Sequence, residues 1–120
     1  MLYCILGCGS AGVLTALELI QRGIPTKDIL IIDPYFDGGS LFRKWSSIHS
    51  NTRWEQIRDI MIQYESSRSA INILNEKYLG EQTVLLSDLG WLLQESIKPY
   101  LETIQTKIDF CIEIKSLMMR

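Results

Sequence analysis

Residues 5–12 read ILGCGSAG, a G-x-G-x-x-G pattern that directly follows a short apolar run. Where a strand turns into a helix, the first glycine (Gly7) permits the tight turn and the second (Gly9) lets the backbone approach a pyrophosphate. The third glycine, Gly12, lets the helix pack closely against the strand. The stretch therefore predicts a strand, a turn and a helix that together hold an adenine dinucleotide.

The flanking sequence predicts the two strands and the helix that meet at this turn. Residues 2–6 form a continuous apolar run, which is typical of a buried parallel strand. A helix is expected from Ser10 to about Arg22, because apolar residues recur at helical spacing and Gly23 is a good C-terminal stop. Residues 29–32 carry only isoleucine and leucine and predict the second strand. This order indicates a right-handed βαβ unit.

The expected ligand contacts lie at the helix start and after the second strand. The backbone amides of Ser10 and Ala11 open the helix, where free N–H groups and the helix dipole favour a negative pyrophosphate. Asp33 follows the second strand, where an acidic side chain accepts hydrogen bonds from the ribose hydroxyls. The same carboxylate would repel a 2′-phosphate, so NADP is disfavoured, while FAD and NAD both remain open.

The middle of the chain predicts a loop and a helix. Residues 34–52 are expected to form the loop, with a short helical turn near residues 41–45. Apolar residues then follow one helical face over residues 53–78 and predict one long helix. The serine-rich run at residues 66–69 is the point where this helix would break.

The C-terminal part predicts a helix and a third strand. Ser87 or Asp88 is expected to cap a helix that continues to residue 104, with a kink or a restart near Lys98 because Pro99 lies inside the pattern. Apolar and polar residues alternate over residues 108–114, which predicts a strand. The fold class expected is therefore α/β, a Rossmann-like FAD/NAD(P)-binding βαβ unit with a parallel sheet, additional helices and a third strand near the C-terminus.

Length and composition narrow the functional classes. The 120 residues suffice for one domain at most. A net charge of −2 gives no electrostatic argument for binding nucleic acid, and no apolar stretch approaches the length of a membrane span. Three cysteines without a secretion signal favour reduced thiols and a cytoplasmic location. A single histidine excludes a metal site built from several histidines, and no metal is expected.

The sequence after the second strand resembles one family of proteins. Asp33 is followed by the doublet Gly38-Gly39, and an acid followed by such a doublet resembles the signature of flavoproteins with two dinucleotide-binding domains. In that family the doublet lets the chain pass close to the ribose and pyrophosphate of FAD, whereas simple NAD dehydrogenases have no need of it. The resemblance implies FAD as the cofactor, with NAD as the alternative.

Later segments resemble the flavin-dependent monooxygenases of that family. Trp45 comes shortly after the doublet and is followed by Ser50-Asn51-Thr52. Residues 97–117 are similar to the segment that leads from a helix back into the sheet in those enzymes. The implied function is the FAD-binding N-terminal portion of a flavin-dependent oxidoreductase.

Two departures from the family limit what the resemblance implies. No Cys-x4-Cys follows Gly39, so the redox-active dithiol of the disulfide reductases is not expected. The later strands and the second glycine motif of the family are also missing. The chain is therefore interpreted as a single, incomplete FAD/NAD(P)-binding domain spanning residues 1–120, whose catalytic residues are unknown and which needs a missing C-terminal half or a partner chain.

Two further functions remain as alternatives. One is a non-catalytic or remnant module that binds NAD or another nucleotide. The other is an E1-like adenylating protein, which Asn51 and Arg53 resemble only superficially, because their spacing from Asp33 does not fit. The residues expected to contact the cofactor are Gly7, Gly9, Ser10, Ala11, Gly12, Asp33, Pro34, Gly38, Gly39, Arg43 and Trp45.

Overall fold

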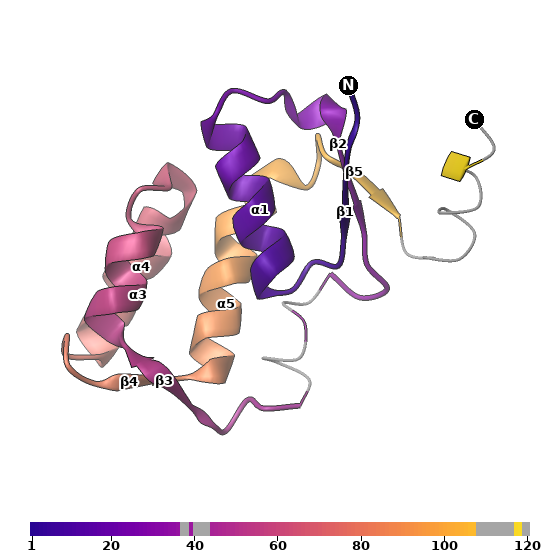
Figure 1. The fold of residues 1–120 in the computed structure, drawn as a ribbon. Helices are drawn as coiled ribbons and strands as arrows, with labels where there is room; N and C mark the ends of the chain where they lie inside the picture. The colour runs from indigo at the N-terminus through magenta and orange to yellow at the C-terminus, as the bar shows by residue number, and fades with distance from the viewer. Residues whose placement is uncertain (37–38, 40–43, 108–116, 119–120) are drawn as a thin grey trace.

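The computed structural model describes residues 1–36, 39, 44–107 and 117–118, and it has a mixed α/β fold (Figure 1). Its parallel sheet has the strand order β1-β2-β5, with β1 (Tyr3–Leu6) and β5 (Gln105–Lys107) on either side of β2 (Ile29–Ile32). Tyr3 pairs with Ile29, and Leu30 pairs with Gln105. All four residues of β2 are buried, as expected for the central strand of a parallel sheet.

The strand–helix–strand order predicted for the N-terminal part is confirmed, but β1 is not the buried strand that was predicted: only Ile5 is buried, and Cys4 and Leu6 are exposed. The helix α1 (Ser10–Gln21) connects β1 to β2 and is followed by a short 3-10 turn, η1 (Thr26–Asp28). Figure 1 shows α1 and α5 (Leu86–Ile97) side by side next to the sheet. A parallel sheet within an α/β chain is thus shown.

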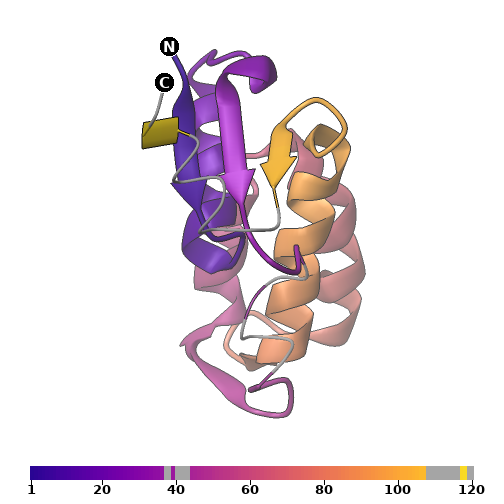
Figure 2. The ribbon, with the colours of Figure 1, turned by 90° about the vertical axis from the view of Figure 1, so that its right-hand side faces the viewer.

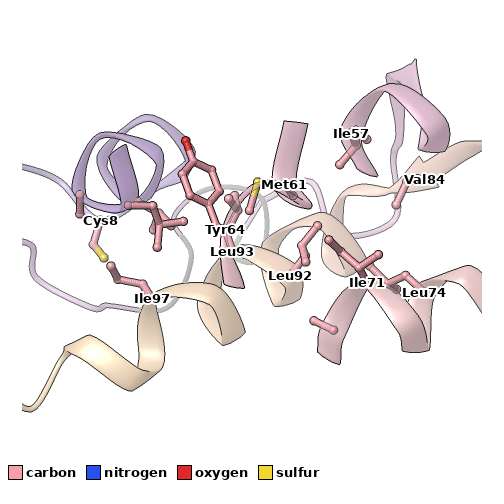
Figure 3. Packing of buried hydrophobic residues seen from close by; sticks show 14 of the residues in the cluster. Cys8, Ile57, Met61, Tyr64, Ile71, Leu74, Val84, Leu92, Leu93 and Ile97 are labelled. Carbon is pink, nitrogen blue, oxygen red and sulfur yellow. The ribbon is translucent and has the colours of Figure 1, made fainter. Parts of the chain in front are cut away.

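The buried residues form one continuous core from the sheet to the outer helices. Figure 3 shows this core extending from Cys8 and Ile97, past Tyr64 and Leu93, to Val84 near the far end. The apolar faces of α1 and α5 both contribute to this core, so each helix buries its apolar face against the other helix as well as against the sheet.

The helical segment predicted over residues 53–78 is two helices, and the break predicted near Ser66 is confirmed. Helix α3 (Trp54–Met61) ends well before Ser66, and a turn with the 3-10 segment η2 (Glu65–Ser67) leads into α4 (Arg68–Lys77). The break lets both apolar faces reach the same core, which one straight helix could not do. Trp54 on α3 is fully buried, and its ring N–H donates to the side chain of Asn75 on α4 (2.8 Å).

A two-stranded antiparallel sheet was not predicted from the sequence. It pairs β3 (His49–Arg53) with β4 (Thr83–Leu85), and it joins the start of α3 to the start of α5. Four of the five residues of β3 are exposed and polar or charged, so this strand has no apolar alternation that could indicate it.

The helix α5 begins and ends differently from its prediction. The N-cap is Leu85 rather than Ser87 or Asp88, because the amides of Leu86 and Ser87 donate to the carbonyls of Ile48 (2.8 Å) and Ser46 (3.3 Å). These backbone acceptors replace a side-chain cap. The helix does not continue to residue 104: α5 ends at Ile97, and the 3-10 turn η3 (Lys98–Tyr100) follows at the point where a kink or a restart was predicted.

The third strand lies earlier in the chain than the predicted segment. Strand β5 covers Gln105–Lys107, whereas the predicted residues 108–114 lie outside the described part of the chain, as does most of the loop near residues 41–45. Within the described ranges no helix combines the length and the apolar character that crossing a membrane requires.

Two adjacent serines give a matched test of the helical packing. The hydroxyl of Ser67 is fully buried and lies 2.6 Å from that of Ser96 on α5, which itself donates to Leu92. Ser67→Ala should lower the free energy of unfolding by about 1 kcal/mol, because a buried hydrogen bond is lost. The buried hydroxyl of Ser66 has no partner among the described residues, so Ser66→Ala should cause no loss. Urea titrations of both variants measure the free energy of unfolding, and equal losses in the two variants would contradict the prediction.

The stability of the helical part depends on pH through the ionisation of Asp88. Burial would raise the pKa of Asp88, but hydrogen bonds from Lys77 and Tyr78 and the charge of Lys77 outweigh burial and hold this pKa below 3.8. A carboxyl with a lowered pKa in the folded state stabilises the fold above its unfolded pKa, and this stabilisation is lost as the pH falls through the folded value. Asp88→Asn should therefore be less stable than the parent at pH 7, and the difference should shrink below about pH 4. A difference that stays constant between pH 7 and pH 3 would contradict this assignment.

Candidate nucleotide-binding site

Gly7 forms the sharp turn at the carboxyl end of β1. Its amide donates to the carbonyl of Ile32 at the end of β2 (2.7 Å), so the turn continues the pairing of the two strands. Its φ of +101° lies in the region that L side chains rarely adopt. The fold itself therefore requires glycine at position 7.

Gly12 is required by packing. A Cβ built on Gly12 would lie 2.0 Å from the carbonyl oxygen of Gly7 and 3.4 Å from the side chain of Ile5. Because the first oxygen belongs to the backbone of the turn, no rotamer change could make room for it. The first turn of α1 rests directly on the end of β1, as the sequence pattern predicts.

Gly9 differs from these two glycines. It is the N-cap of α1 and has an extended backbone, with a φ of −86°. A Cβ at this position would meet only the Cα of Gly39, at the ordinary van der Waals distance of 3.9 Å. Among the described residues, neither backbone conformation nor packing accounts for a glycine at position 9.

The start of α1 has the features of an anion site. The amides of Ser10 and Ala11 precede the first hydrogen bond of the helix, in which Val13 donates to the carbonyl of Gly9 (2.9 Å). Both residues are exposed, and the first turn carries no acidic side chain. Amides at a helix N-terminus and the helix dipole favour a negative group at this point.

Asp33 ties the end of β2 to the glycine turn. One carboxylate oxygen accepts a hydrogen bond from the amide of Cys8 (2.9 Å), and the other accepts from the amides of Tyr35 (2.9 Å) and Phe36 (2.6 Å). The residue is only 6% exposed. The predicted ribose ligand is thus also a structural acceptor for three amides, and a ribose hydroxyl would share the carboxylate with them.

The structure places one glycine of the doublet directly against the turn. Gly39 is buried and has a φ of +76°, and a Cβ built on it would lie 3.0 Å from the Cα of Gly9. Two segments that are far apart in the sequence therefore meet through glycines. Gly38 and Arg43, the other residues expected nearby, lie outside the described residues.

The remaining predicted residues have less specific positions. Pro34 is exposed beside Asp33. Trp45 is half-exposed, in a loop whose carbonyls at Ser46 and Ile48 accept hydrogen bonds from the start of α5 rather than from the glycine turn. Cys8 and Phe36 were not predicted as parts of the site. Like Tyr35, they contact Asp33 through their backbone amides, and a backbone contact cannot be predicted from residue type.

A hydrogen bond further along α1 fixes the position of this helix. Tyr64 donates to the carboxylate of Glu18 (2.9 Å), which also accepts from Arg22 on the same helix. The hydrogen bond from Tyr64 is the main reason that the pKa of Glu18 is lowered, while burial is the main reason that the pKa of Tyr64 is raised. The contact holds α1 against the turn that follows α3.

No protein-family model, curated protein or solved structure matches the chain. The described residues contain no group of three or more histidine, cysteine or acidic side chains placed to hold a metal ion.

Gly12 and Gly9 give a sharp test of this geometry. Gly12→Ala should lower the free energy of unfolding by about 3 kcal/mol, because its methyl group overlaps the backbone of the turn. Gly9→Ala should change it by less than about 1 kcal/mol, because among the described residues the added methyl group makes only an ordinary van der Waals contact, with Gly39. Chemical denaturation of both variants compares them, and similar losses would show that the turn is arranged differently.

Proposed function

We propose that the chain binds an adenine dinucleotide, FAD, as the N-terminal cofactor-binding part of a flavin-dependent oxidoreductase. The observation that carries this proposal is Gly9. Gly7 is needed for its conformation and Gly12 for its packing, whereas no described residue would clash with a side chain at position 9. Close approach of a phosphate to the backbone would explain why position 9 is glycine.

Three further features support a Rossmann-like site. The parallel order of β1, α1 and β2 presents the helix N-terminus at the carboxyl end of the strands, where ligands bind in open α/β sheets. The amides of Ser10 and Ala11 would contact the pyrophosphate. Asp33 would receive a ribose hydroxyl on the oxygen that Cys8 also contacts, which disfavours NADP for reasons of charge.

The choice of FAD over NAD depends on the glycine doublet. The contact between Gly39 and Gly9 brings the segment after β2 against the pyrophosphate-binding turn, which fits the role that the doublet has in the flavoproteins this sequence resembles. When bound, FAD would supply hydride and oxygen chemistry, while the protein supplies position and electrostatics. A nucleotide-binding module without catalysis is the second candidate, because nothing in the described residues forms a catalytic group.

Retention of flavin tests the proposal. The chain is incubated with excess FAD and desalted, and its visible absorbance and its affinity for FAD are measured. We expect flavin bands close to equal stoichiometry. Gly9→Ala should weaken FAD binding about tenfold or more, because the methyl group occupies the space of the phosphate.

The control is Gln21→Ala, an exposed change at the far end of α1. It should retain flavin as the parent does. Thermal unfolding of all three proteins establishes that they are folded. A folded parent that retains no flavin, or a Gly9→Ala variant that binds FAD as tightly as the parent, would refute the proposal.

A further inference from the structure

A cavity lies where the turn held by Asp33 meets the last turn of α5. It has a volume of about 260 Å³ and is lined by Phe36, Gln94, Glu95, Ile97, Lys98 and Leu101. The chain leaving β2 turns toward α5 in Figure 2, and this brings Phe36 to the cavity wall. Phe36 has a φ of 54°, a conformation that is uncommon for a bulky side chain and is held here by its 2.6 Å hydrogen bond to Asp33.

We propose that this cavity holds the base of the bound nucleotide and that Gln94 selects adenine. The inference rests on the proposed function, because it places one part of the same ligand. The carboxylate of Asp33 accepts from Cys8 in the glycine turn and from Phe36 at the cavity. The phosphate-binding turn and the cavity wall are therefore held to one another by a single side chain.

The shape and charge of the cavity suit a neutral planar ring. Its volume is below the range of about 300–1,000 Å³ typical of complete ligand pockets, so it would take one ring system rather than a whole dinucleotide. Phe36 offers an aromatic face, and Ile97 and Leu101 add apolar surface. Among the described residues that line the cavity, the acid Glu95 and the base Lys98 balance in charge.

Gln94 supplies the discriminating chemistry. A glutamine amide can accept a hydrogen bond from the N6 amino group of adenine and donate one to N7. Hypoxanthine has an acceptor oxygen at position 6, so the same amide would make only one of these bonds. Gln94 is half-buried on α5, so its side chain has limited conformational freedom but can still contact a ligand.

ADP and IDP test this subsite because they differ only in the base. Calorimetric titration of the chain should give about tenfold tighter binding of ADP than of IDP. Gln94→Ala should bring this ratio close to one. Phe36→Leu should weaken the binding of both nucleotides, because the aromatic face is lost. The control Gln21→Ala, on an exposed residue at the end of α1, should keep the ratio of the parent.

The outcomes separate the subsite from the proposed function. Retention of FAD with equal affinity for ADP and IDP would overturn the base subsite alone, and so would an unchanged ratio in Gln94→Ala. A folded parent that binds neither FAD nor ADP would overturn both proposals. Gln94 is not part of the buried core, so its variant provides the test even where Phe36→Leu fails to fold.

Discussion

The contact between the Cα of Gly12 and the carbonyl of Gly7 is the constraint on which the arrangement depends. It sets how closely α1 approaches β1, and there is no space for even a methyl group between them. From this contact α1 continues to Glu18, where Tyr64 holds it, and its apolar face meets α5. The position of the helix start, and hence of its exposed amides, follows from this packing distance together with the hydrogen bonds that hold the glycine turn to the end of β2.

The sequence predicted the elements whose side chains are determined by burial. The run at residues 29–32 is apolar because all of β2 is buried, and the spacing of apolar residues in α1 follows its buried face. In β1 only Ile5 is buried, so the apolar run at residues 2–6 predicted the strand but not its exposure. The glycine pattern also predicted the turn, since Gly7 and Gly12 are required by conformation and packing. In these segments local pattern and tertiary structure agree, which is the condition for successful prediction.

Elsewhere the structure depends on backbone contacts, which cannot be predicted from residue type. The start of α5 is fixed by the carbonyls of Ser46 and Ile48, so the capping potential of Ser87 and Asp88 is not used. Strand β3 pairs through its backbone while most of its side chains face solvent. The hydrogen bonds of Asp33 to three amides belong to the same class, and they give a residue predicted to bind ribose a role within the fold as well.

The central position of β2 has a consequence for the order of folding. Its pairing with β1 closes a short segment containing α1, whereas its pairing with β5 joins Leu30 to Gln105 across all the outer helices. Closing the longer segment costs about 1 kcal/mol more in chain entropy. The glycine turn therefore lies in the half of the sheet that can assemble first, and the far strand joins a sheet edge that is already formed.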